Sequence, residues 1–335
     1  MSVYVGIDGH RKRSQIAVVD HDGAVQVNRH VPNGVETVLS VIGDLPIGAP
    51  VAFEAASGWG WLVELLEDYG FEPHLVHPLR CKAIASDRLK NDKVDAATLA
   101  QLLRADLLPE AWIARLQVRQ QWAPLRHRCQ LVRLRTLLRN RVHAVLADYG
   151  CDRSGAASPL RGGAGSTAWT CRTPPAAWST IFWSRWTLSK EPLDAPDQQL
   201  VAHARGDPRV KTPTRLPGVG TLTARIIVAE IGDVSRFPSA RKLTAWAGLT
   251  PTVRSSDLTV RHGHISKQGS DWLRWILCEA ARTAKRSPEF AASHQRLARR
   301  RGKKIATTAI ARRLPARACH LLRAVQAQRD RRGAR

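Results

Sequence analysis

Short runs of β-branched and other apolar residues, separated by polar turns, fill the first 110 positions of the chain. Runs of this kind predict strands at 3–8, 15–19, 24–31, 51–54 and 73–76. An Asp-Gly pair between the second and third of these runs indicates a tight hairpin. Apolar residues at helical spacing predict helices at 33–44, 61–66 and 92–104. The first third of the chain is therefore expected to fold as three strands followed by alternating helices and strands.

The order βββαβαβα is that of the ribonuclease-H-like fold, in which acidic residues occupy the ends of central strands and a late helix. Four carboxylates occur at such positions. Asp8 ends the first strand, Glu54 ends the fourth, and Asp92 and Asp95 lie three residues apart at the start of the last helix. Phosphoryl transfer uses oxygen ligands of this kind to hold two Mg²⁺ ions about 3.5–4 Å apart. We therefore expect a Mg²⁺ site, with Mn²⁺ as the alternative ion.

Simpler interpretations of these residues exist. An Asp at a strand end is commonly a turn residue, and Asp92 with Asp95 also has the spacing of a helix cap followed by an acidic residue in the first turn. The histidines of this region are expected to be polar turn or strand-end residues rather than metal ligands: His10, His74 and His77. Catalysis is favoured because all four carboxylates occur together.

The middle of the chain is basic and then irregular. Residues 114–149 are predicted to be helical, with an apolar stripe at steps of three and four (Leu131, Leu134, Leu138, Val142, Val145 and Tyr149) and arginines on the remaining surface. This pattern favours a coiled-coil-like arm that also touches nucleic acid, although a solvated helix face is the alternative. Residues 153–196 keep no helical or strand period, which is typical of a disordered linker or of an out-of-frame stretch.

The last third of the chain carries several turn motifs. Arg215-Leu-Pro-Gly-Val-Gly220 predicts a helix-hairpin-helix element, in which Gly218 and Gly220 allow a tight turn and free backbone N–H groups bind a phosphate. A plain helix–helix turn is the alternative. A polar loop with Ser255 and Ser256 follows, and then a helix through Arg274. We take Gly218, Gly220, Lys267 and Arg274 as candidate nucleic-acid-binding residues.

The predicted domain organisation has four parts. Residues 1–110 form an α/β ribonuclease-H/RuvC-like domain, 111–152 a basic helical arm, 153–200 an irregular linker, and 201–335 a mainly α-helical domain with the helix-hairpin-helix element. Six cysteines without a CxxC pair indicate neither a zinc cluster nor a disulfide framework. The start of the chain lacks a signal-peptide pattern and no apolar run is long enough for a membrane span, so we expect a cytoplasmic protein.

The charge of the chain is large and unevenly distributed. The net charge is +24 at pH 7, with 52 basic and 28 acidic residues. Residues 1–110 carry 10 basic and 15 acidic residues, whereas residues 111–335 carry 42 and 13. A polyanionic partner is therefore expected to bind the last two-thirds of the chain, although charge alone cannot distinguish DNA from RNA.

Taken together, these motifs resemble those of the transposases of the IS110 insertion-sequence family and its IS1111 relatives. The motifs that carry the resemblance are Gly-Ile-Asp8, Phe-Glu54, Lys-Asn-Asp92-x-x-Asp95-Ala, Leu-Pro-Gly-Val-Gly220, Ala-Gly-Leu-Thr-Pro251 and Ile-Ser-Lys-Gln-Gly269. The resemblance covers nearly the whole chain and fails mainly at 153–196. Each motif is weak by itself, and the specificity lies in their combination.

The resemblance implies a mechanism. A RuvC-like domain in that family carries an Asp-Glu-Asp-Asp metal site, which corresponds to Asp8, Glu54, Asp92 and Asp95. A serine in the C-terminal domain attacks DNA, and here Ser256 is the first choice and Ser255 the second because Asp257 replaces the usual glycine. The resemblance also implies a structured non-coding guide RNA, DNA partners at the element ends and the target, a homo-oligomer (dimer or tetramer), and a bacterial protein on the nucleoid when bound to DNA.

Three rival functions are compatible with the same sequence. A stand-alone RuvC-like structure-selective nuclease would need the four carboxylates but no C-terminal serine. A basic nucleic-acid-binding protein without enzymatic activity would need neither. A decayed transposase copy would be inactive because of residues 153–196.

Overall fold

The computed structural model divides the chain into two compact units, Met1–Arg115 and Leu116–Arg335. The division follows residue 115, whereas the sequence predicts it after residue 110. The structure describes residues 2–55, 58–84, 92–148, 191–256 and 259–333. Most of the segment predicted to be an irregular linker, residues 153–190, lies outside the described residues.

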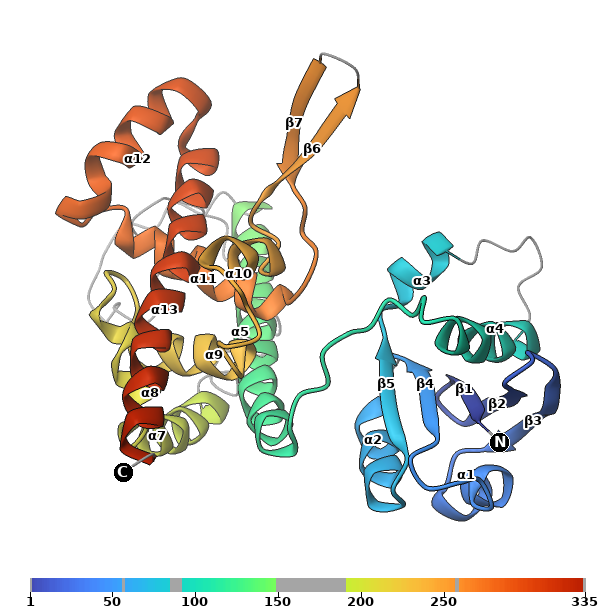
Figure 1. Cartoon of the computed structure of the whole chain (residues 1–335). Helices are drawn as coiled ribbons and strands as arrows, with labels where there is room; N and C mark the ends of the chain where they lie inside the picture. The colour runs from blue at the N-terminus through green and yellow to red at the C-terminus, as the bar shows by residue number, and fades with distance from the viewer. Residues whose placement is uncertain (1, 56–57, 85–91, 149–190, 257–258, 334–335) are drawn as a thin grey trace. The chain divides into compact units, whose positions relative to one another are not determined.

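The first unit is built on one mixed sheet (Figure 1), in which the strands lie in the order β3-β2-β1-β4-β5. Its strands are β1 (Val3–Gly9), β2 (Arg13–Asp20), β3 (Val25–Pro32), β4 (Pro50–Glu54) and β5 (Glu72–Val76). The pairs β1–β2 and β2–β3 are antiparallel, whereas β1–β4 and β4–β5 are parallel. All five predicted strands are confirmed, and the unit is a mixed α/β domain around a central sheet.

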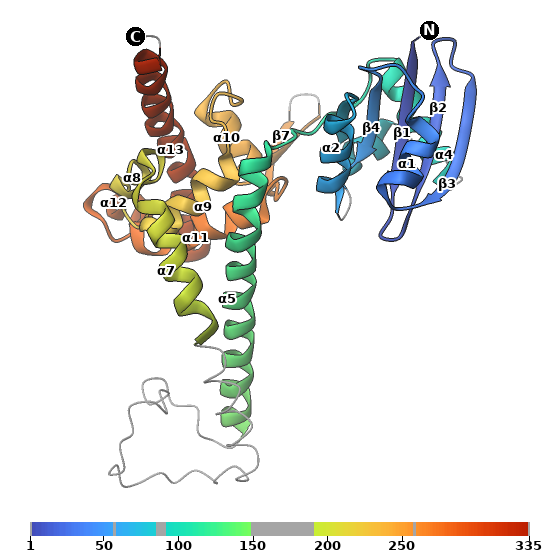
Figure 2. The same ribbon diagram turned by 90° about the horizontal axis from the view of Figure 1, so that it is seen from below.

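Helices cover both faces of this sheet. The helices of the first unit are α1 (Val35–Ile42), α2 (Trp59–Asp68), α3 (Pro78–Ile84) and α4 (Asp92–Arg104). Figure 2 shows α1 and α2 on one face of the sheet and α4 on the other. Val5 and Ile7 of β1 belong to the core beneath α1 and α2, whereas Ala52 of β4 belongs to a separate core with Leu99 of α4. Because side chains alternate along a strand, Gly6 and Asp8 lie on the face that α4 covers.

Gly6 sets how closely α4 approaches the sheet. A Cβ atom at this buried position would overlap the carbonyl oxygen of Ala96 and the amide nitrogen of Ala100. The backbone of α4 therefore rests directly on β1, and the two alanines on that side of the helix are fully buried. Only glycine leaves room for this contact, which brings the start of α4 to the end of β1.

The second unit is mostly helical, as predicted. Its elements are α5 (Leu116–Asp148), α7 (Glu191–Arg205), α8 (Pro208–Lys211), the 3₁₀ turn η1 (Pro213–Arg215), α9 (Thr221–Ile231), α10 (Ala240–Trp246), β6 (Pro251–Ser256), β7 (Thr259–Ile265), α11 (Asp271–Ala284), α12 (Pro288–Arg301) and α13 (Lys303–Gly333). Two local predictions are wrong. Residues 191–200 form the first part of α7 rather than an irregular linker, and the expected serine loop is the β6–β7 hairpin.

A buried carboxylate ties α5 to the rest of the second unit. The Glu230 side chain of α9 is only 4% exposed. It accepts hydrogen bonds from Arg126 of α5 at 3.1 and 3.3 Å and from Ser270 at 2.6 Å. The Trp122 indole nitrogen donates to the Ala229 carbonyl at 2.8 Å. These hydrogen bonds satisfy the Glu230 carboxylate and the Trp122 indole, and they tie the start of α5 to α9.

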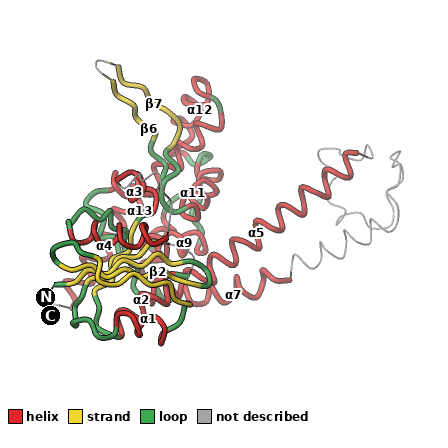
Figure 3. The backbone as a smooth tube through the Cα atoms, turned by 90° about the vertical axis from the view of Figure 1, so that its right-hand side faces the viewer, coloured by secondary structure: helices red, strands yellow, loops and turns green. Residues whose placement is uncertain are grey.

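Some arginines of α5, predicted to lie on the surface of the helix outside its apolar stripe, instead contact other elements of the unit. Arg126 pairs with Glu230, Arg128 pairs with Asp197 of α7 at 2.5 Å, and Arg133 lies over the Trp272 ring. These contacts agree with the placement of α7 beside α5 (Figure 3). Guanidinium groups engaged in this way contribute to packing within the unit rather than to an external surface.

The rest of α5 is more open. Pro124 lies inside the helix. Leu134 of the predicted apolar stripe is 53% exposed, and Leu137 beside it is 63% exposed. Among the described residues, no helix combines the length and apolar character that a bilayer span requires.

The contact at Gly6 can be tested by adding one methyl group. We expect Gly6→Ala to lower the free energy of unfolding of the first unit by about 1–3 kcal/mol, because the new Cβ overlaps the backbone of α4. Gly60→Ala in α2 is the matched control, since a Cβ there meets nothing within 4 Å. Urea denaturation of the full chain measures both, and equal stability of the two variants would contradict the close contact.

Candidate functional site

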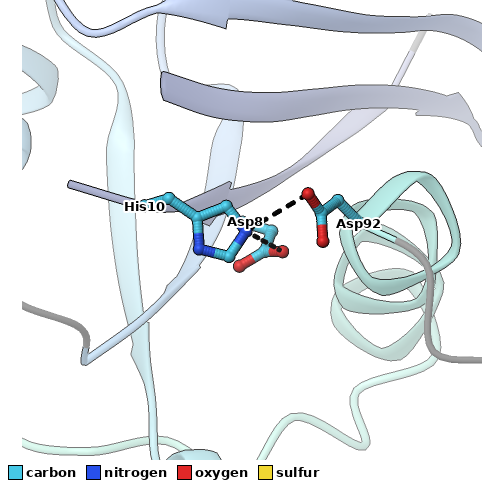
Figure 4. A group of neighbouring side chains, drawn as sticks. All are labelled: Asp8, His10 and Asp92. Atoms are coloured by element: carbon cyan, nitrogen blue, oxygen red, sulfur yellow. Dashed lines mark ion pairs between the residues drawn. The ribbon is translucent and has the colours of Figure 1, made fainter. Parts of the chain in front are cut away.

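Two of the four predicted carboxylates meet at the end of the first unit's central strand, together with a histidine (Figure 4). His10 Nε2 lies 3.4 Å from Asp8 Oδ2 and 3.3 Å from Asp92 Oδ2. One ligand atom from each of the three residues falls within 4.8 Å of the other two. The Asp8 side chain is 13% exposed, whereas those of His10 and Asp92 are about half exposed at 52% and 49%. The group is therefore open to an ion from solvent.

The backbone around His10 is fixed on both sides. Its N–H donates to the Arg13 carbonyl at 2.9 Å, and its own carbonyl accepts from Asn33 Nδ2 at 2.7 Å. Ser14 Oγ in turn donates to Asn33 Oδ1 at 2.7 Å, which orients the Asn33 amide. The turn between β1 and β2 is thus held by β2 and the residue after β3, so the imidazole is presented at a defined place beside Asp8.

A series of side-chain hydrogen bonds also holds the start of α4. Asn28 of β3 donates through Nδ2 to the Lys93 carbonyl at 3.0 Å. The buried Gln15 side chain donates to Asn28 Oδ1 at 2.5 Å. At the other end of the helix, Gln101 Nε2 donates to the Gly23 carbonyl at 2.6 Å. Together with the contact at Gly6, these bonds determine where Asp92 lies.

Glu54 and Asp95 lie beside this group but are not members of it. The β1–β4 register pairs Ile7 with Phe53, so the next residues, Asp8 and Glu54, end neighbouring parallel strands. Asp95 is three residues after Asp92 on α4. Burial raises the pKa of the Cys81 thiol, and the nearby carboxylates of Glu54 and Asp95 raise it further. Both carboxylates are therefore close to one buried thiol on the α4 side of the sheet.

This donor set fits a divalent cation. Carboxylate oxygens are ligands that Mg²⁺ and Mn²⁺ prefer, and imidazole nitrogen suits the transition metals among the divalent ions. Carboxylates this close repel one another, and a cation between them removes that repulsion. The sequence predicts a turn role for His10, and its place in this group is an addition from the structure. The signal that could have found it is its position two residues after Asp8, in the turn that ends the same strand.

The two candidate serines lie in the second unit, in the strand β6 rather than in a loop. Both are exposed. Ser255 lies opposite Val260, and Ser256 lies opposite Thr259. Because consecutive side chains along a strand alternate, the two hydroxyls are on opposite faces of the hairpin.

The predicted phosphate-binding glycines have different roles. Gly218 adopts φ +76°, and a Cβ there would overlap the backbone of α11 at Ala280 and Ala284. This glycine therefore serves helix packing. Gly220 is exposed at the start of α9, where no side chain caps the helix, so its neighbouring N–H groups are the better phosphate donors of this turn.

Lys267 and Arg274 also differ. The Lys267 side chain is exposed, and its backbone N–H donates to the Gly248 carbonyl at 3.1 Å. Arg274 Nη1 lies 3.5 Å from the Gln268 carbonyl, and its Nη2 pairs with Asp271. Burial lowers the pKa of the Arg274 guanidinium. Arg274 thus holds the base of the hairpin, while Lys267 remains available to a partner.

Comparison with known proteins places both units in one group. Residues 5–150 match a family model described as a transposase, of the DEDD type of IS110, and residues 212–295 match the model described as "Transposase IS116/IS110/IS902 family". The chain is 28% identical over 295 residues to a Pseudomonas aeruginosa protein named "Probable family 20 transposase", covering 84% of each chain. It is 27% identical to the transposase for insertion sequence element IS1111A of Coxiella burnetii, covering 83% of this chain and 76% of that one.

The support beneath Asp92 can be tested through metal affinity. We expect Asn28→Ala to weaken Mn²⁺ binding by about 10–100-fold, because it removes the bond to the Lys93 carbonyl that positions the start of α4. Gln26→Ala on the same strand is the control, since that side chain donates to Asp20, the last residue of β2, and not to α4. Titration with Mn²⁺ followed by electron paramagnetic resonance measures both, and equal affinities would contradict the role of Asn28.

Proposed function

The chain belongs to the IS116/IS110/IS902 family of transposases, and we propose that it cuts and rejoins DNA strands at the ends of a mobile element by a serine nucleophile assisted by a metal centre. The observation that carries the proposal is the meeting of Asp8 and Asp92 beside His10, from elements far apart in the sequence. The shared family supports DNA as the partner. The metal and serine chemistry rests on the arrangement of this chain's own residues.

We assign the metal site to Asp8, Glu54, Asp92 and Asp95, with His10 as an additional ligand. Asp8, His10 and Asp92 are already within ligand distance of one another. Glu54 is included because the strand register makes it the neighbour of Asp8 on the next strand. Asp95 is included because it lies three residues after Asp92 on the same helix. A bound Mg²⁺ or Mn²⁺ ion would supply Lewis-acid polarisation of the scissile phosphate. The residues themselves hold the ion and, through the rigid contact at Gly6, keep its ligands in place.

We assign the nucleophile to Ser256. Its Oγ forms a bond to the scissile phosphorus while one phosphorus–oxygen bond to the sugar breaks, and the serine proton ends on the released hydroxyl. The covalent phosphoserine ester conserves the energy of the broken bond. Attack by the hydroxyl of another strand end then joins the two DNA strands and restores the free serine. The proposal requires the carboxylates and the serine to act on one phosphodiester, within one chain or between copies in a homo-oligomer.

The second unit supplies surfaces that suit a nucleic acid. Consecutive exposed cations end α12 and begin α13, at Arg299, Arg300, Arg301, Lys303 and Lys304. A surface of this kind binds phosphates regardless of base sequence. Sequence choice would then come from elsewhere, and we propose a structured guide RNA that pairs with target and element-end DNA.

Removal of the central carboxylates tests the metal assignment. We expect Asp8→Asn and Asp92→Asn each to lower the rate of strand cleavage by about 10²-fold or more, since a polarising metal contributes several kcal/mol to the transition state. Mn²⁺ binding should fall in parallel. Asp22→Asn, at an exposed turn of the same unit, should leave both unchanged. Cleavage at the unsubstituted rate in both variants would contradict the assignment of the metal site to these carboxylates.

Replacement of the serines tests the covalent step. We expect Ser256→Ala to abolish the covalent protein–DNA product while Mn²⁺ binding by the first unit is unchanged, and Ser255→Ala to retain the product. Denaturing gel electrophoresis of labelled DNA with the full chain detects the ester. Cleavage and joining that survive the replacement of both serines would instead support a RuvC-like structure-selective nuclease. Absence of product from the unsubstituted, correctly folded chain would indicate a decayed copy.

A further inference from the structure

The β6–β7 hairpin is an unusual element because both of its faces are open. Every described residue from Thr252 to His264 is exposed. Figure 1 shows the ribbon projecting from the helices of the second unit. A two-stranded hairpin with neither face covered is at best marginally stable by itself. The ribbon is therefore expected to have its binding partner outside the described fold of this unit.

The strand register divides the hairpin into two chemically different faces. Arg254 lies directly opposite Arg261, and Ser256 directly opposite Thr259. Residues opposite each other in an antiparallel pair share a face, as do residues two apart on one strand. One face therefore carries two arginines and two hydroxyls. The other carries Val253, Ser255, Val260 and His262, and its two valines are each 57% exposed.

The arginine pair is electrostatically unfavourable without an anion. Like charges placed directly opposite on neighbouring strands destabilise a sheet. Among the described residues, no Asp or Glu forms an ion pair with Arg254 or Arg261. A phosphate diester between the two guanidiniums would remove the repulsion, and the planar fork of arginine matches phosphate oxygens.

Ser256 is placed to act on a phosphate bound in this way. It follows Arg254 by two residues on the same strand and the same face, a rise of about 7 Å along the ribbon. Arginine side chains are long enough to reach across that interval. Ser255, in contrast, faces away with the valines. The pairing pattern thus distinguishes the two serines on grounds independent of the family motif.

The base of the hairpin is rigid, so the ribbon has a defined direction at its origin. A Cβ at Gly248 would overlap the Gln268 backbone, and one at Gly269 would overlap the Trp246 carbonyl. Ser266 N–H donates to the Thr250 carbonyl at 2.8 Å. The two glycine motifs that flank the hairpin therefore pack backbone against backbone, which anchors both strands together.

We infer that Arg254 and Arg261 together bind the DNA phosphodiester that Ser256 attacks. The inference deepens the proposed function and rests on it for the role of the serine. The arginines act by holding the phosphate and neutralising its charge, while the serine supplies the attacking oxygen. The partner is the sugar–phosphate backbone of DNA, because the planar fork of each guanidinium matches phosphate oxygens and the bond that Ser256 attacks lies in that backbone.

The experiment measures DNA binding and covalent product formation separately. Arg254→Gln and Arg261→Gln are made singly and together, each with Ser256 intact and in the Ser256→Ala background. Each neutralised phosphate contributes about 1 to the slope of log affinity against log salt concentration. Because the two arginines share one phosphate, we expect the double variant to lose about 1 in slope in both backgrounds and each single variant to lose part of that amount. With Ser256 intact, the rate of covalent product formation should fall by at least tenfold.

Two further variants exclude a purely structural effect. Val260→Thr, on the opposite face of the same strand, should change neither the salt slope nor the rate. Arg254→Lys with Arg261→Lys should retain the salt slope, because the charge remains, but not the full rate, because the fork that matches phosphate is lost. Thermal unfolding should show no loss of stability in the glutamine variants, since they remove a repulsion.

The outcomes separate this inference from the proposed function. Unchanged salt slopes and rates in the arginine variants would overturn the inference and leave the serine mechanism standing. Slopes that fall as expected, in a chain whose Ser256→Ala variant still forms the covalent product, would overturn the serine assignment and leave only the phosphate-binding pair. Val260→Thr behaving like the arginine variants would overturn the division of the hairpin into two functional faces.

Discussion

The close contact between the backbone of α4 and the central strand β1 is the constraint on which the candidate metal site depends. Gly6 permits it, because any Cβ at this position would overlap α4. Strand alternation then places Asp8 on the same face two residues later, and the helix begins with Asp92 at that edge. Ala52 and Glu54 repeat the pattern on the neighbouring strand. A small residue followed two positions later by an acid thus marks both strands where the helix covers the sheet.

The second unit is a helical body from which an exposed two-stranded hairpin projects. The buried Glu230 carboxylate is partnered by Arg126 and Ser270, so its own charge is compensated where it joins α5 to α9. At the base of the hairpin, the segments before β6 and after β7 are in backbone contact at Gly248 and Gly269. Rigidity is thus concentrated at the base, while the polar and apolar faces of the ribbon stay open to partners.

Sequence reasoning succeeded where a pattern is local and failed where a contact is between distant residues. The strands of the first unit and α4 are predictable from the spacing of apolar residues, because one face of each element is buried. The role of Arg128 could not be inferred, because its partner Asp197 lies 69 residues away. The hairpin around Ser256 was predicted as a loop, since its exposed strands lack the alternation of a half-buried sheet. His10 was predicted as a turn residue, and it is one; its neighbours Asp8 and Asp92 come from separate elements.

The amino-acid sequence by itself determined the class of the first unit, the helical character of the second, the separation of charge between them and the identity of the candidate carboxylates, because each depends on residue type and short-range period. Only the tertiary structure decided that an imidazole joins two of those carboxylates and that the two serines occupy opposite faces of a ribbon. The physical reason is the same in both cases. Ligand distance and strand register are set by packing and pairing between segments that are not neighbours in the chain.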